Sequence, residues 1–333
     1  MDNGATMHLA VSLVPDTSPG ADLGFNRLAR FVKKAEAAGL DMVLLADSAP
    51  ATSSDAPNGK VPFEATTLLA ALATVTRRIG LVAAASTVAH QPYNLARRFA
   101  SLDIISHGRT GWHATMAPDP REAANFSRPE GFSSDEFRRR TQEYIGIVQG
   151  LWNGWDADAL LFDKSGGRFH DPEKMHLLDH KGEFFSVRGP LNVARSPQET
   201  PVLVLSGVAE PYMDIAARTA DVILLGEQPA ERAKAIYDDL KRRALAFSRD
   251  PRAVKVLMTT APVIDGSDEF ADRLQAFFRS KSCDGFNLLI PPSAFDDFVD
   301  RVLPQLRRRG LVRSGYRGAT LRSHLRLAGG GDQ

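Results

Sequence analysis

The chain has 333 residues, of which 43% are hydrophobic and 24% charged, a balance typical of a soluble globular protein. Its 41 Lys and Arg against 40 Asp and Glu give a net charge of +1, so bulk charge attracts neither nucleic acid nor an anionic membrane. The single cysteine, Cys283, excludes an intrachain disulfide and a cysteine-based metal cage. The opening stretch MDNGATMHLA lacks the features of a signal peptide, and no apolar run is long enough to cross a membrane, so we expect a cytoplasmic protein.

The first third of the chain alternates short apolar runs with amphipathic stretches. Four strands are predicted, at residues 7–14, 41–48, 79–87 and 109–116. Helices are predicted between them, at residues 25–40, 63–78 and 94–106.

The alternation stops after Ala117 and resumes near residue 201. The interruption holds a helix from about Asp135 to Trp152 and a long loop with little periodicity. Four more strands are then predicted in the runs PVLVLSG, DVILLGE, VKVLMTTAPVI and GFNLLIPP, with helices between and after them and a basic, irregular tail.

Eight strand and helix pairs favour parallel strands joined by crossover helices. A (β/α)₈ TIM barrel with a long loop insertion between its fourth and fifth strands suits both the count and the length. The alternative, a doubly wound open sheet, normally shows a Gly-rich phosphate loop after its first strand, and VPDTSPGADLG is not such a loop. The sequence therefore predicts the barrel.

The C-terminal ends of barrel strands carry the chemistry of this fold. The residues at the predicted strand ends are Asp47, Ser86 with Thr87, His113, Ser206 with Gly207, Glu227 and Pro291. His8 falls at the opposite, structural end. From the pattern alone, Asp47 is a turn cap or a ligand contact, and Ser86 and Thr87 bond either local backbone or a ligand.

Other candidate chemistry finds less support. There is no G-x-S-x-G motif, and Cys283, just before a strand, is expected to be a small buried residue. His170, His176 and His180 lie in HDPEKMHLLDH, where a polar loop clasping another part of the surface is favoured over a metal site.

Long stretches resemble the bacterial-luciferase-like flavin monooxygenases. They include AEAAGLDMVLLADS, the run from TLLAALATVTRRIG to ISHGRTGW, AANFS, the run from LWNGWDADALLF to PVLVLSG, AARTADV and CDGFNLLIPP. Within that family the chain is similar to the nitrilotriacetate monooxygenase, pristinamycin synthase and dibenzothiophene-sulfone monooxygenase branch. The similarity runs from about Met7 to Leu327, so we expect one TIM-barrel domain over residues 7–327, with flexible termini at 1–6 and 328–333.

The resemblance implies a monooxygenase that uses O₂ and reduced FMN, bound as a dissociable co-substrate. A separate flavin reductase would supply the electrons, and the substrate would be a small organic molecule. The cofactor then carries the oxygen chemistry, which accounts for the missing nucleophile and metal motifs. The resemblance also suggests a homodimer through helices near the second and third strands. A catalytically silent flavin-binding member or partner subunit is the rival hypothesis, and a deazaflavin-dependent oxidoreductase is a third.

Site residues carried over from the family form three groups. Asp47, Thr87 and His113 would line the flavin ring. Tyr93 would lie near the ribityl chain or substrate and, with His113, belong to the catalytic groups. On the phosphate side the resemblance places Asn125, Arg138 and the loop Ser206, Gly207, Val208 and Ala209.

Four departures from the branch pattern bear on activity. GWH stands where the branch has GWN, so His113 replaces an asparagine. The phosphate loop reads SGVAEP instead of AGSS, which removes two hydroxyls. The helix after the fourth strand usually opens with a His and a Tyr in this branch, and Ser134 and Arg138 stand near those places. A long segment normally found between APVIDG and SDEFADRL is missing, which we expect to open the barrel mouth after the seventh strand.

Overall fold

The computed structural model describes residues 6–13, 24–46, 63–126, 128, 130–262 and 267–329. Eight parallel strands close into a barrel in the order β1-β12-β11-β10-β9-β4-β3-β2. The strands are β1 (His8–Leu13), β2 (Met42–Leu45), β3 (Gly80–Ala84), β4 (Thr110–Thr115), β9 (Val202–Ser206), β10 (Val222–Leu225), β11 (Lys255–Thr260) and β12 (Gly285–Ile290). The predicted TIM barrel is confirmed.

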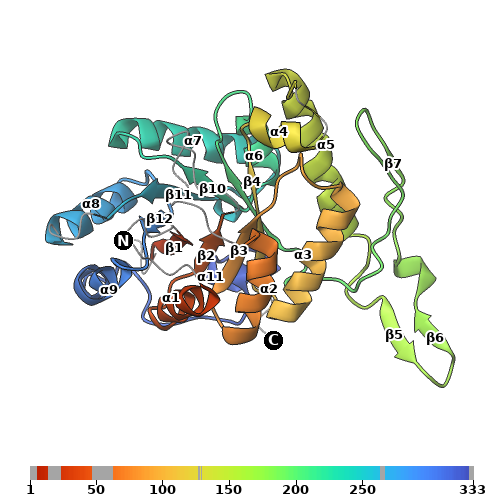
Figure 1. Cartoon of the computed structure of the whole chain (residues 1–333), viewed down its shortest axis with the longest axis horizontal. Helices are drawn as coiled ribbons and strands as arrows, with labels where there is room; N and C mark the ends of the chain where they lie inside the picture. Colours follow the sequence, from red (N-terminus) through yellow and green to blue (C-terminus); the bar gives the residue numbers. More distant parts are fainter. Residues whose placement is uncertain are drawn as a thin grey trace.

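Helices surround the barrel, as Figure 1 shows. They are α1 (Phe25–Ala37), α2 (Ala65–Val75), α3 (Pro92–Ser106), α4 (Pro120–Asn125), α5 (Ser134–Trp152), α6 (Met213–Thr219), α7 (Ala230–Ala246), α8 (Ser267–Arg279), α9 (Phe295–Asp297) and α10 (Leu303–Arg308), with a π-helical turn at Phe298–Val302. A further helix, α11 (Leu321–His324), belongs to the C-terminal tail and lies behind the strands in Figure 1. In the described part of the chain, no helix has the length and apolar character that crossing a membrane requires.

The tail closes the N-terminal end of the barrel. Leu321, Leu325 and Leu327 pack in one cluster with inward-facing strand residues such as Val82 and Val204. At Gly80 a Cβ atom would lie 2.4 Å from Leu321 Cδ1, so only a glycine leaves room for this leucine. With this end filled by the tail, the C-terminal end is the one left for a site.

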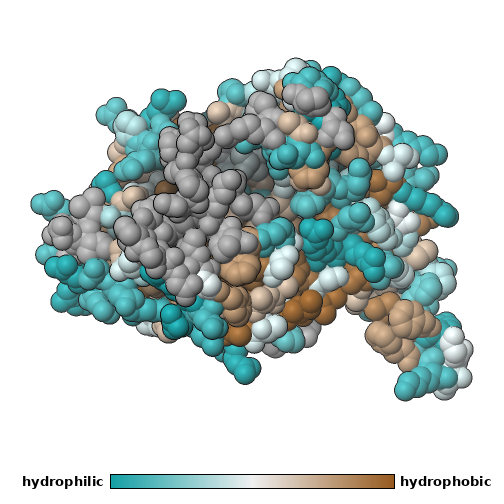
Figure 2. All heavy atoms as spheres, viewed as in Figure 1, coloured by the Kyte–Doolittle hydropathy of each residue, from teal (hydrophilic) through white to brown (hydrophobic). Residues whose placement is uncertain are grey.

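The insertion between β4 and β9 forms an arm (Figures 1 and 2). Two small antiparallel pairs, β5 (Leu160–Asp163) with β6 (Arg168–His170) and β7 (His180–Lys181) with β8 (Ser186–Val187), build it. His180 Nε2 lies 2.9 Å from Glu143 Oε1 of α5. The polar segment HDPEKMHLLDH therefore contacts another part of the surface, as predicted. Figure 2 shows the β5–β6 end projecting from the surface with apolar side chains on it; Phe162 and Phe169 are each 62% exposed.

The link between β11 and α8 is short. β11 ends at Thr260 and α8 begins at Ser267, so six residues join them. This agrees with the missing segment inferred from the sequence at this point.

Candidate active site

Strand β4 sends neighbouring side chains in opposite directions, as a strand must. Trp112 is fully buried among Phe99, Tyr144 and Trp152 of the surrounding helices, and its Nε1 donates to the carbonyl of Ala85 at 2.8 Å. Trp112 therefore fixes the strand against α3 and α5, while the next residue points inward.

His113 faces the barrel interior. It is paired in register with Val204, which belongs to the inward-facing cluster. Its Nε2 lies 2.8 Å from Ser206 Oγ, and Thr115 Oγ1 lies 3.4 Å from the same hydroxyl. Burial lowers the pKa of His113 to about 4, so the imidazole is neutral at pH 7 and keeps one donor and one acceptor nitrogen.

The loop after β9 follows directly on Ser206. Gly207 has φ +68°, a backbone conformation that favours glycine. Within the described residues, no acceptor is paired with the amides of Gly207, Val208 or Ala209. Adjacent free amides in a turn form a concave site that suits an anion. The two side chains after the glycine add no hydroxyl to it.

A second polar cluster lies across the barrel. Ser12 Oγ donates to Asn287 Oδ1 at 3.0 Å, and Asn287 Nδ2 donates to Thr259 Oγ1 at 3.3 Å. In the ring of eight strands, β12 is opposite β4 and β1 is opposite β9. The Ser12–Asn287–Thr259 cluster therefore faces the His113–Ser206 pair, and both walls are uncharged at neutral pH.

Ser86 and Thr87 follow β3, as expected. Ser86 Oγ accepts from the amide of Val88 at 2.9 Å and so caps a local turn. Thr87 is buried, and its carbonyl accepts from Arg140 Nη1 at 2.7 Å. Thr87 therefore lies where α5 contacts the mouth of the barrel.

Arg140 is the residue that the sequence analysis missed. Its guanidinium lies 4.8 Å from the ring centroid of Phe185 and 5.4 Å from that of Phe132, and burial lowers its pKa. The available signal was helical phase: Arg140 precedes Tyr144 by four residues, and Tyr144 lies on the buried face of α5.

Among the described residues, three predicted site residues form no hydrogen bond with His113 or Ser206. Asn125 is exposed at the end of α4. Arg138 Nη2 donates to Asp135 Oδ1 at 2.7 Å, with its charge near enough to Tyr212 to oppose the burial that raises that tyrosine's pKa. The Tyr93 hydroxyl is 3.5 Å from the carbonyl of Pro190 in the arm.

The remaining candidates have local roles or cannot be placed. Glu227 pairs with Arg273 at 3.3 Å, and Cys283 is buried, as predicted. His8 Nδ1 is 3.6 Å from Asp41 Oδ1 at the closed end of the barrel. Asp47 lies outside the described residues. Among the described residues, no group of three or more His, Cys, Asp or Glu could hold a metal ion.

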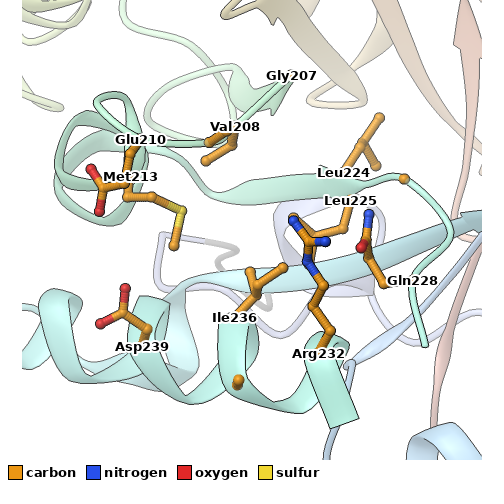
Figure 3. Close-up of a pocket in the computed structure, with 13 residues that line it drawn as sticks. Gly207, Val208, Glu210, Met213, Leu224, Leu225, Gln228, Arg232, Ile236 and Asp239 are labelled. Atoms are coloured by element: carbon orange, nitrogen blue, oxygen red, sulfur yellow. The ribbon is translucent and has the colours of Figure 1, made fainter. Parts of the chain in front are cut away.

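A cavity of about 560 Å³ adjoins the loop after β9. Residues of that loop, α6, the end of β10 and α7 line it, and Figure 3 shows their side chains. Its inner end reaches Gly207 and Leu224, and the latter also packs inside the barrel.

Comparison with known proteins identifies the family. The sequence model of the luciferase-like monooxygenases matches residues 7–318. This chain belongs to the luciferase-like monooxygenase family. It is 33% identical to N-acetyl-S-(2-succino)cysteine monooxygenase of Bacillus subtilis (strain 168), with 97% of this chain and 95% of that protein covered. It is 32% identical to nitrilotriacetate monooxygenase component A of Aminobacter aminovorans, with 94% and 92% covered.

The solved EDTA monooxygenase from Chelativorans sp. BNC1 shares the fold of this luciferase-like chain. The TM-score is 0.87 at 23% identity, with 97% of this chain and 99% of that chain covered. The expectation that the chain is a flavin-dependent monooxygenase of this branch is confirmed.

The comparison also confirms that the luciferase-like chain is shortened. The alignment with the Bacillus subtilis protein spans 417 positions, so a chain of 333 residues leaves at least 84 of them (417 − 333) without a counterpart.

Proposed function

We propose that the chain uses O₂ and reduced FMN, supplied as a dissociable co-substrate by a separate flavin reductase, to oxygenate a small organic substrate. The observation that carries this proposal is the run of free amides at Gly207, Val208 and Ala209 beside the His113–Ser206 pair. The amides suit the phosphate, and the neutral polar pair suits the edge of the flavin ring.

When bound, reduced FMN supplies the reaction with O₂ that places one oxygen atom in the substrate. His113, which stays neutral, offers hydrogen bonds without bringing a charge to the ring. The opposite wall of Ser12, Asn287 and Thr259 orients a polar group of the substrate. The fixed protein groups thus replace water around the reacting atoms.

The test is a titration of the purified protein with FMN, followed by mixing the reduced complex with O₂. We expect binding at micromolar concentrations and reoxidation of the bound flavin in stages distinct from those of free FMN. No binding at tens of micromolar would contradict the proposal.

Loss of the loop hydroxyls at Val208 and Ala209 favours a second candidate, a catalytically silent flavin-binding member or partner subunit. That protein would bind FMN, but its reduced complex would react with O₂ as free flavin does.

Sedimentation of the purified protein tests the proposed homodimer separately.

His113→Asn is expected to strengthen FMN binding by about two- to tenfold, the effect of one net hydrogen bond. The amide keeps a donor and an acceptor, as the neutral imidazole does, but it is shorter and leaves the room that the ring needs to form a hydrogen bond with it. The measurement is an FMN titration by fluorescence. The matched control is His107→Asn at the exposed C-cap of α3, which should leave affinity unchanged. Equal affinities of His113→Asn and the wild type would place the flavin ring away from this side chain.

A further inference from the structure

The cavity beside the loop after β9 combines an apolar body with one charged end. Val208, Met213, Leu225 and Ile236 belong to its apolar lining. Figure 3 shows Arg232 and Gln228 close together at one end of the cavity and Glu210 and Asp239 at the other. Its volume of about 560 Å³ lies in the range of small-molecule sites.

The two acids at the far end are each paired with an arginine. Arg243 forms an ion pair with Glu210, and its Nε donates to Asp239 Oδ2 at 2.8 Å. Arg242 also pairs with Asp239. Each of the two lining carboxylates is therefore paired with an arginine, and Arg243 also pairs with Asp214 outside the cavity lining.

Arg232 differs from its neighbours because it has no carboxylate partner among the residues that the structure describes. It stands in the first turn of α7, a helix of 17 residues, where the helix dipole adds positive potential. The amide of Gln228 supplies a second donor beside it. A fork of guanidinium donors with an amide next to it matches a carboxylate.

We propose that this cavity binds a small amphipathic carboxylate, with its anionic group on Arg232 and its apolar chain along Met213, Leu225 and Ile236. The ligand's inner end would reach Gly207 and Leu224, beside the barrel mouth. The site is separate from the His113–Ser206 pair, although its lining includes Gly207, Val208 and Ala209 of the proposed phosphate loop. It is thus a second small-molecule site, beyond the proposed oxygenation.

The test uses octanoate as the probe, with binding followed by isothermal titration calorimetry and ligand-observed NMR. Arg232→Gln should weaken octanoate binding by about tenfold, because it replaces a charge-assisted hydrogen bond with a neutral one. Octylammonium and octan-1-ol should bind the wild type more weakly than octanoate. Lys234→Gln is the matched control: it removes a cation of the same helix that is paired with Asp238 and lies outside the cavity lining.

A second variant narrows the cavity without altering Arg232. Ala235 is exposed on α7 and lines the cavity, so Ala235→Phe should weaken octanoate binding while the protein stays folded. Octanoate should bind the FMN-free protein, whether or not the protein oxygenates anything. The proposal is overturned if Arg232→Gln binds octanoate like the wild type, or if octylammonium binds as tightly as octanoate.

Discussion

Arg109→Met is expected to lower the free energy of unfolding by about 4 kcal/mol, because several buried carbonyls lose their donor at once. Arg109 Nη1 donates to Ile79 O at 2.9 Å and to Thr76 Oγ1 at 3.0 Å. Its Nη2 reaches the carbonyls of Ala73 and Thr76 at 3.2 Å, and its Nε donates to Ser106 O at 2.7 Å. The guanidinium thus closes the C-terminal end of α2, whose last carbonyls have no partner within the helix.

Urea denaturation followed by circular dichroism measures this loss. Arg97→Met is the matched control, since Arg97 is exposed on α3 and its replacement should change stability by less than about 0.5 kcal/mol. A loss below about 1 kcal/mol for Arg109→Met would mean that water or relaxed backbone satisfies these carbonyls. Because Arg109 directly precedes β4, we also expect the variant to bind FMN more weakly than Arg97→Met.

The barrel was predictable because its signal is local. Each strand and helix pair repeats the same alternation of apolar runs and amphipathic stretches, and the count of eight selects the closed sheet. The pairing within the site was not predictable from pattern. His113 and Ser206 are 93 residues apart, and they meet because β4 and β9 pair as the fourth and fifth strands of the barrel across the long insertion. The resemblance to a family nominated both residues, and the structure supplies the contact between them.

Other features depend on packing that a pattern does not encode. The tail was expected to be irregular, yet Leu321 enters the barrel because Gly80 leaves room for it. Arg138 and Arg140 are two residues apart and look alike in the sequence. Helical phase turns Arg140 toward Thr87 and leaves Arg138 with Asp135 near the surface. In each case the outcome depends on a neighbour that is distant in the sequence.

The tail also buries a histidine, and this burial gives stability a pH dependence. His324 is 2% exposed, with its ring centroid 4.8 Å from that of Tyr316. Burial, aided by the positive charge of Arg313, lowers its pKa to about 4, while the attraction of Asp41 only partly opposes this. Below pH 6.5 the imidazole of His324 is protonated in the unfolded chain, whereas in the native state it stays neutral until about pH 4. Stability from this group is therefore full above pH 6.5 and is lost as the pH falls toward 4.

On acidification, His324→Phe should lose about 3 kcal/mol less unfolding free energy than the wild type, since a shift of one pKa unit corresponds to about 1.4 kcal/mol. The quantity to measure is the difference in unfolding free energy between variant and wild type, from pH 7.5 to pH 4.5. The difference is needed because Asp103 titrates with the opposite sign: burial raises its pKa to about 6, so its protonation favours the native state as the pH falls. The exposed His107→Asn variant should keep the wild-type pH dependence. If His324→Phe keeps it too, the buried ring accepts its proton in the folded state, and the closed end of the barrel admits water.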